Sequence, residues 1–261
     1  MPHALHGVLC YLMTKTLRSV NEKIKVEFNV EEHTYHYEGK QFFSASTFAA
    51  KYGGDDFDAE RIAMAYSQKH DVDMDDVLDM WDSNGTIAAG YGTAIHAVME
   101  HYYKFKKLGA TLQEATGSEF NKAMPNHPDL RNLIIGVEEV REDCESIQEA
   151  FVTLAAKQKC GQIDDLLIVD KKKKICKIVD YKITVDILKE NKKLAAPFAY
   201  LGGSKLSKNF VQMAFYAYLM QASGWKVQSC DILNWNGHEW TKYTLDGPKL
   251  MKTMLLIANE I

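Results

Sequence analysis

The sequence lacks a cysteine pattern that would hold a metal ion or a network of disulfides. Its five cysteines are odd in number and scattered, and no two form a Cys-x-x-Cys pair. This spacing argues against a zinc knuckle and against a disulfide-stabilised scaffold. Free thiols are typical of a reducing cytoplasm, so we expect a cytoplasmic protein.

Long apolar runs and an excess of basic charge are also missing. No stretch approaches the length of a membrane span, and residues 1–17 lack the charged start and long apolar run of a signal peptide. The chain has 31 Lys and Arg against 35 Asp and Glu, a net charge of −4. We therefore expect no membrane partner, and any contact with nucleic acid must rely on local basic patches.

The chain of 261 residues is long enough to bury a sizeable core, and it contains no internal repeat. We expect an N-terminal strand pair and helical elaboration over residues 1–84 and a core over residues 85–261, together forming one compact unit. Hydrophobic periodicity and turn residues predict the individual elements. Helices are expected at 58–69, 73–82, 93–107, 128–142, 209–220 and 248–260, with a break at 82–85, and strands at 146–158, 162–169, 175–183, 226–235 and 239–244.

The most informative stretch is the predicted β-hairpin of residues 162–169 and 175–183, which surrounds a lysine-rich turn. Side chains alternate along a strand, so Asp180 and Lys182 share one face, and Asp164 falls opposite the end of the second strand. Three charged groups then converge, and leaving them unpaired would be costly. A metal ion and its water would satisfy them, although Asp-x-Lys is also common on solvated sheet faces.

Two predicted helices each carry a pair of polar side chains four residues apart, hence on one helical face. The first pair is His96 and Glu100, in a helix for which Thr93 is the expected N-cap. This pair can bind or orient a divalent cation; the alternative is a core histidine beside a rim charge. The second pair is Gln212 and Tyr216, for which the alternative is a packed helix with one buried amide.

These motifs follow one another as Gly-Thr-x-x-His-x-x-x-Glu at 92–100, Gly-x-x-Asp at 161–164, Asp-Tyr-Lys at 180–182 and Gln-x-x-x-Tyr at 212–216. The order of these motifs, over roughly residues 85–222, resembles that of the RecB-like branch of the PD-(D/E)XK nuclease superfamily. The chain is similar above all to the phage-type and mitochondrial-genome-maintenance-type exonucleases, whose opening strand pair and Ser-x-Thr segment resemble residues 32–48. The resemblance implies an α/β fold, with a mixed central sheet flanked by helices and an N-terminal helical elaboration.

The resemblance also implies a metal site. Its ligands would be His96, Asp164, Asp180 and the backbone carbonyl of Tyr181, with Glu100 and Glu149 as weaker candidates. Asp165 should face the opposite side of its strand. Some relatives clamp an iron–sulfur cluster with one cysteine before the core and a group after it. That pattern is absent from this sequence, so we expect no cluster.

The expected chemistry is phosphodiester hydrolysis with Mg²⁺ or Mn²⁺, which lowers the pKa of a bound water and neutralises charge on the phosphate. Oxygen ligands suit Mg²⁺, and an imidazole shifts the preference toward Mn²⁺. Lys182 would be the catalytic lysine, stabilising the phosphate or orienting the nucleophile, so its loss should spare metal binding but abolish turnover. Gln212 and Tyr216 would support the active site and the adjoining DNA backbone.

Lysines near the predicted site form a local basic patch. Lys205 and Lys208 belong to the loose stretch 185–208 and could hold DNA phosphates, with Thr184 as a weaker candidate. The alternative is a solvated polar insert with no ligand.

We therefore expect a Mg²⁺- or Mn²⁺-dependent deoxyribonuclease that hydrolyses DNA with single strands or free ends. It would act in recombination, repair or phage DNA processing, and in the host cytoplasm if a phage encodes it. The resemblance alone favours an exonuclease, and the helices before residue 93 with the 185–208 stretch could form an arch that threads a single strand. The alternatives are a structure-specific endonuclease, a catalytically silent DNA- or protein-binding module with the nuclease fold, and a metal-dependent hydrolase of a non-nucleic substrate. The sequence does not indicate protein partners.

Overall fold

The computed structural model describes residues 14–53, 59–107, 130–190 and 192–261. The chain divides into two units, of which the first is Met1–Gly54 with Ile135–Ile261 and the second is Asp55–Ile134. The first unit carries a large mixed sheet with helices packed on it, which confirms the expected mixed α/β class. The boundary expected between residues 84 and 85 is not tested by this grouping and stays a prediction.

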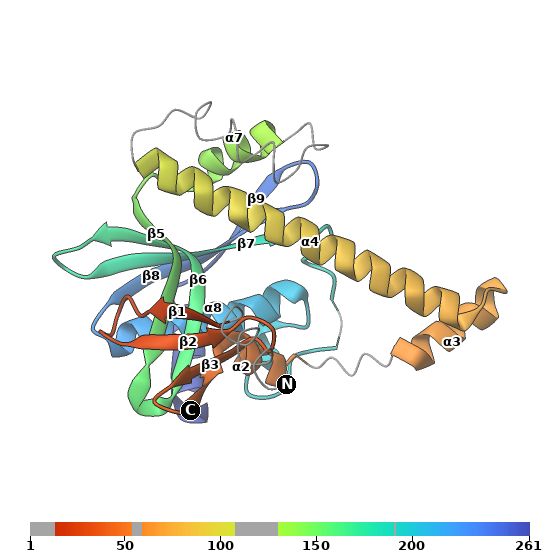
Figure 1. Ribbon diagram of the computed structural model, residues 1–261, viewed down its shortest axis with the longest axis horizontal. Helices are drawn as coiled ribbons and strands as arrows, with labels where there is room; N and C mark the ends of the chain where they lie inside the picture. Colours follow the sequence, from red (N-terminus) through yellow and green to blue (C-terminus); the bar gives the residue numbers. More distant parts are fainter. Residues whose placement is uncertain (1–13, 54–58, 108–129, 191) are drawn as a thin grey trace, which may run out of the picture. The chain divides into compact units, whose positions relative to one another are not determined.

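Within the described residues, the sheet of the first unit has nine strands (Figure 1). They pair in the order β1–β2–β3–β4–β6–β7–β8–β9, and β5 pairs with β6 outside this path. Most neighbours are antiparallel, whereas β4–β6 and β7–β8 run parallel. The strands are β1 (Thr14–Arg18), β2 (Lys25–Asn29), β3 (Thr34–Tyr37), β4 (Lys40–Ser44), β5 (Glu145–Leu154), β6 (Lys159–Asp170), β7 (Ile175–Ile183), β8 (Lys226–Trp235) and β9 (Trp240–Asp246).

The predicted hairpin is confirmed as β6 and β7. Asp165 pairs with Val179 in antiparallel register, so Asp164 stands opposite Asp180, as the alternation of side chains predicts. The lysine-rich residues 171–174 form the turn between the two strands. The chain around the turn therefore brings the acids of both strands to the same end of the hairpin.

The expected N-terminal strand pair is also present, as β3 and β4. Glu38 and Gly39 join the two strands with φ values of 50° and 72°, the left-handed conformation that a tight hairpin turn requires. Ser44 ends β4, lies opposite Cys160 of β6, and accepts a hydrogen bond from the Thr47 amide as the N-cap of α2 (Ala45–Lys51). This parallel pairing places the start of α2 beside the first residues of the β6–β7 hairpin.

Helix α8 (Lys205–Ala222) contains the predicted helix 209–220 but begins earlier. Ser204 is its N-cap and accepts from the amide of Ser207 at 3.2 Å, and Gly224, with a φ of 83°, follows its last turn. Lys205 and Lys208 therefore lie in the first turn of a helix. The expectation that both belong to a loose insert is wrong, because the Ser204 cap starts the helix before them.

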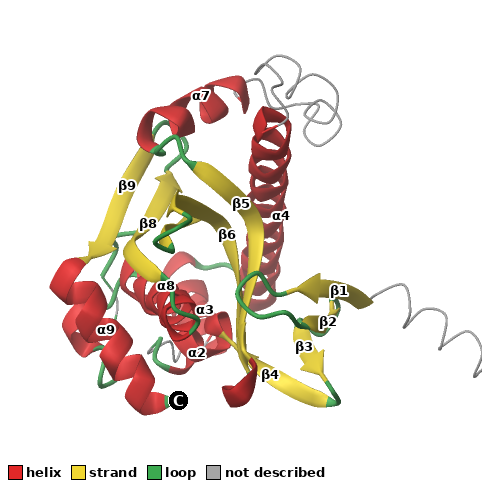
Figure 2. Cartoon of the chain, turned by 90° about the vertical axis from the view of Figure 1, so that its left-hand side faces the viewer, coloured by secondary structure: helices red, strands yellow, loops and turns green. Residues whose placement is uncertain are grey.

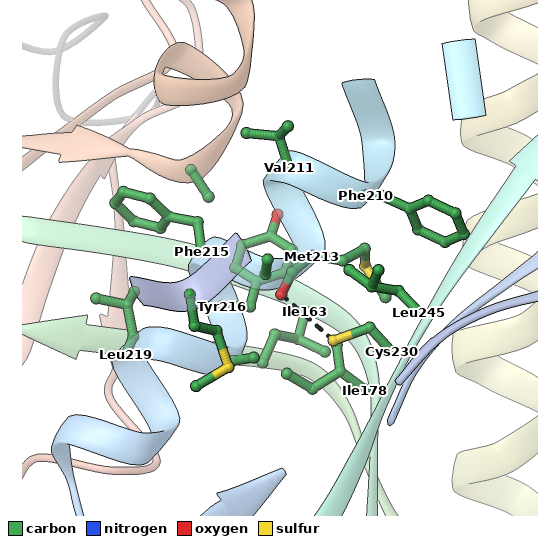
Figure 3. Close-up of a cluster of buried hydrophobic side chains, with 14 of the residues drawn as sticks. Ile163, Ile178, Phe210, Val211, Met213, Phe215, Tyr216, Leu219, Cys230 and Leu245 are labelled. Atoms are coloured by element: carbon green, nitrogen blue, oxygen red, sulfur yellow. Dashed lines mark hydrogen bonds between the residues drawn. The ribbon is translucent and has the colours of Figure 1, made fainter. Parts of the chain in front are cut away.

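One face of the sheet is covered by α2, α8 and α9 (Gly247–Glu260) (Figure 2). Figure 3 shows the apolar side of α8 on Ile163 and Ile178 of the hairpin, and the Cys230 thiol donates to the Met213 carbonyl at 3.5 Å. These side chains are almost completely buried. Burying them in one layer holds the polar residues of α8 at a constant place over the end of the hairpin.

The second unit contains α3 (Ala59–His70) and α4 (Met74–Lys107), and α7 (Leu130–Val140) spans the boundary between the units. The break expected at 82–85 is wrong, because α4 is continuous through Gly85. A single glycine inside a helix costs only about 1 kcal/mol relative to alanine, which the rest of a long helix can absorb. Thr93 therefore lies inside α4 and is no N-cap. In the described part of the chain, no helix is both long and apolar enough to cross a bilayer.

Candidate active site

A pocket of about 210 Å³ opens in the first unit where β6 and β7 meet β3, α2 and α8. Three carboxylates and one ammonium line this pocket, from Glu149, Asp164, Asp180 and Lys182. Gln212 and Tyr216 line it from α8. The remaining lining residues are His33, Tyr35, Ser44, Ala45, Ser46, Gly161 and Gln162. Three separate motifs of the sequence thus contribute to one cavity.

Lys182 and Asp180 form an ion pair inside this pocket, with 2.7 Å between Nζ and Oδ2. Their side chains are 28% and 5% exposed, so the pair is largely shielded from water. Burial disfavours the ammonium, but the carboxylates of Asp180 and Asp164 outweigh this cost and raise the pKa of Lys182. The lysine is therefore a fixed cation at neutral pH. The expectation that both side chains share one face of β7 is confirmed.

Asp164 is held in place by the backbone of the neighbouring strand. The amide of Tyr181 donates to Oδ2 of Asp164 at 2.9 Å. Since this amide lies between Asp180 and Lys182 in the chain, one hydrogen bond ties all three charged side chains to the same short segment. The convergence of these groups, expected from strand alternation, is thereby confirmed.

Glu149 enters the pocket from β5. In the β5–β6 register it falls between the pairs Gln148–Asp165 and Ala150–Ile163, and its φ of 51° marks an irregularity in the strand. Gln162 donates to Oε2 of Glu149 at 2.6 Å. A ligand oxygen of Glu149 lies within 4.8 Å of one of Asp164, close enough for both to bind one cation. Glu149, a weak candidate from the sequence, lies near Asp164, and its part in a metal site stays a prediction.

Gln212 and Tyr216 act as a pair on α8. The Gln212 amide donates to the Tyr216 hydroxyl at 2.7 Å. Burial, and then the negative charge of Asp180, raise the pKa of Tyr216 well above its ordinary value. The hydroxyl stays protonated, so it accepts from Gln212 and can still donate a hydrogen bond to a group in the pocket.

Gly161 explains why the Gly-x-x-Asp motif begins with glycine. A Cβ at this position would overlap the Tyr216 ring, 2.7 Å from its Cδ1 and nearer still to Cε1. We expect Gly161→Ala to lower the free energy of unfolding by about 1–3 kcal/mol, because the ring or strand must shift. Urea denaturation measures this loss.

The steric cause of the Gly161→Ala effect is tested by a second substitution. In a Tyr216→Leu background, Gly161→Ala should cost much less than in the unaltered chain. Gly85→Ala is the control, since a Cβ there meets nothing within 4 Å and alanine favours the helix. An equal loss for Gly161→Ala in both backgrounds would contradict the steric explanation.

A second buried cluster lies behind the site, on the opposite face of the sheet. Arg141 Nε lies 2.7 Å from Oδ2 of Asp165, and the Tyr181 hydroxyl donates to the same oxygen at 3.0 Å. The Arg141 and Asp165 side chains are 2% and 0% exposed. The expectation that Asp165 faces away from Asp164 is confirmed. Because Asp165 and Tyr181 adjoin the pocket residues in sequence, this cluster clamps β6 to β7 directly behind the site.

The remaining predicted site residues are two in the second unit and three in the first. His96 and Glu100 are four apart on α4 in the second unit, and their part in a metal site stays a prediction. Thr184, Lys205 and Lys208 do not line the pocket. Thr184 accepts from the Asp186 amide at 3.3 Å, which is a local turn contact. Binding of nucleic acid by these three residues stays a prediction.

Sequence reasoning did not assign the pocket residues His33, Tyr35, Ser44, Ser46 and Gln162 to the site. The segments around the first four were compared only with the N-terminal strand pair and Ser-x-Thr segment of the nuclease family. Their place in the pocket depends on the parallel pairing of β4 with β6, which joins distant parts of the chain. No local sequence pattern predicts such a pairing.

Comparisons with known proteins do not identify the chain. No protein-family model matches it, and no curated protein matches it. A solved structure titled "Crystal structure of SSO0001" is similar to this chain with 12% sequence identity and a TM-score of 0.27. The match covers 64% of this chain and 72% of that chain. At this TM-score the likeness does not define the fold.

Proposed function

We propose that the protein is a metal-dependent nuclease of the RecB-like PD-(D/E)XK type, which hydrolyses DNA from its ends. The observation that carries the proposal is the meeting of Asp164, Asp180 and Lys182 in one pocket. The two acids come from adjacent antiparallel strands, and the lysine lies 2.7 Å from one of them. Such a group can bind a cation, a phosphate and the attacking water together.

The donor set fits Mg²⁺ or Mn²⁺. Asp164, Asp180 and Glu149 provide carboxylate oxygens in the pocket, and oxygen is the ligand that both cations accept. The backbone carbonyl of Tyr181 would add a further oxygen, as the family resemblance implies. The same resemblance supports His96 as a ligand and Glu100 as a weaker one. When bound, the ion supplies an acidified water and neutralises charge on the phosphate.

The side chains of the pocket support the remaining steps. The Lys182 ammonium, kept charged by Asp180 and Asp164, can donate to a non-bridging phosphate oxygen as negative charge develops there. The protonated Tyr216 hydroxyl, oriented by Gln212, can donate to the same phosphodiester. The cluster of Arg141, Asp165 and Tyr181 keeps the two strands in register behind these groups.

Action on DNA ends rests on the family resemblance, and two alternatives remain. A structure-specific endonuclease would use the same residues on a different DNA shape. A catalytically silent binding module would keep the fold without turnover. The intact set of Asp164, Asp180 and Lys182 favours an enzyme, because a module that has lost catalysis usually loses one of these residues first.

The proposal is tested with end-labelled linear DNA and closed circular single-stranded DNA, each incubated with Mg²⁺ or Mn²⁺. We expect linear DNA to be degraded from its ends and the circle to survive, with no cutting when EDTA removes the metal. Cutting of the circle would favour the endonuclease. If neither DNA is cut with any metal, the enzyme proposal fails and the result favours the catalytically silent binding module.

A further inference from the structure

The candidate pocket is lined by two chemically different groups of side chains. Strands β5, β6 and β7 supply the carboxylates and the lysine. The β2–β3 turn, β3, the end of β4 and the start of α2 supply the hydroxyls of Tyr35, Ser44 and Ser46, together with the imidazole of His33. A phosphodiester bound by the charged groups would therefore share the pocket with neutral and aromatic groups.

The exposed His33 ring is held in place by other aromatic rings. It packs edge-on against Phe28 at 5.1 Å and against Tyr35 at 5.9 Å between ring centroids. Phe28 and Tyr35 are themselves stacked at 4.7 Å, and Tyr35 stacks on buried Phe151 at 5.5 Å. These ring contacts hold the turn against β5. The imidazole that lines the pocket therefore rests on packed aromatic side chains.

The turn that carries His33 has a defined backbone. Asn29 Oδ1 accepts from the amides of Glu31 and Glu32 at 3.0 and 3.2 Å. His33 itself has a φ of 53°, an uncommon conformation for a residue other than glycine. Strained positions of this kind cluster at binding and catalytic sites, where the surroundings maintain them.

We propose that His33, with Tyr35 and Ser46, forms a nucleoside subsite, in which the base next to the scissile phosphate stacks on the imidazole. This inference rests on the proposed nuclease function and adds a contact to the base, which requires single-stranded nucleic acid or a frayed end. A base can stack on an aromatic side chain only when it is unpaired and unstacked from its neighbouring bases. Such stacking tolerates any sequence. The exposed Ser46 hydroxyl also lines the pocket and would contact the sugar.

The test uses Lys182→Ala protein, which is expected to bind DNA but to cut it too slowly to affect a binding measurement, and a set of labelled single-stranded oligonucleotides. Each oligonucleotide lacks the base at one position, and fluorescence anisotropy measures each dissociation constant. We expect the missing base to weaken binding about tenfold at one position near the labelled end and little elsewhere. His33→Ala should weaken binding of the complete oligonucleotide by a similar factor and remove the sensitivity at that position.

Two further variants separate stacking from structural damage. His33→Phe retains an aromatic face and should keep the positional sensitivity. His36→Ala is the matched control, because His36 lies on the same hairpin, contacts Thr34 at 3.2 Å and does not line the pocket. It should bind like the parent protein.

The outcomes of this test distinguish the nucleoside subsite from the proposed nuclease function on which it rests. Binding that is insensitive to missing bases, or a positional effect that survives His33→Ala, overturns the subsite while the nuclease proposal stands. Failure of the Lys182→Ala protein to bind any oligonucleotide, together with no cutting by the unaltered chain, overturns both.

Discussion

Replacing Lys182 with alanine is expected to slow phosphodiester hydrolysis by about 100- to 1000-fold, the loss typical when one donor to a developing negative charge is removed. Binding of Mn²⁺ should persist, because Asp164 and Asp180 remain and lose a competing cation 2.7 Å from Oδ2 of Asp180. Single-turnover cutting of end-labelled DNA measures the rate. Isothermal titration calorimetry measures the affinity for Mn²⁺.

Lys242→Ala is the matched control for Lys182→Ala. Lys242 is 30% exposed and lies 3.4 Å from the buried carboxylate of Asp231, so its setting closely parallels that of Lys182. It does not line the pocket, and its loss should leave the cutting rate unchanged. A similar fall in rate for both variants would show that the loss at Lys182 reflects stability rather than catalysis.

Replacing Arg141 with methionine is expected to have the largest effect on stability, a loss of about 3–5 kcal/mol in the free energy of unfolding. The substitution keeps much of the side-chain volume but removes the cation 2.7 Å from Asp165, whose side chain is completely buried. The hydrogen bonds of Asp165 with the Tyr181 hydroxyl and with Gln148 remain, but neither partner replaces the lost positive charge. Urea denaturation followed by circular dichroism measures the loss.

The double variant Arg141→Met with Asp165→Asn tests the reason for that loss. Removing both charges should recover part of the stability, since the uncompensated carboxylate is gone. Lys173→Met is the control, because Lys173 pairs with Asp170 at 3.5 Å on the surface, and its loss should change stability little. A double variant no more stable than Arg141→Met alone would contradict the electrostatic explanation.

Local patterns predicted the β6–β7 hairpin well because its information lies within about twenty residues of sequence. Two apolar runs surround a polar turn, and the two-residue period of a strand decides which side chains share a face. Asp180 and Lys182 could therefore be placed together, and Asp165 away from Asp164, before any coordinates were known. The pairs Gln212–Tyr216 and His96–Glu100 were predicted in the same way from helical spacing.

Helix α4 shows where local signals mislead. Asp82, Ser83, Asn84 and Gly85 are residues typical of turns, yet the helix continues through them from Met74 to Lys107. Propensity differences of a few tenths to about 1 kcal/mol per residue are small compared with the cooperative hydrogen bonding of a long helix. The predicted N-cap at Thr93 was wrong for the same reason, since no helix starts there.

By itself, the sequence determined the candidate site residues and their local neighbours: the acids and lysine of the hairpin and the glutamine–tyrosine pair of α8. Only the tertiary structure decided that these groups share a pocket with Glu149, His33 and Ser46, and that Arg141 stabilises the strands behind them. The physical reason is distance along the chain. Strand and helix periods act over a few residues, whereas the pairing of β4 with β6 and the packing of α8 depend on burying apolar side chains from segments far apart in sequence.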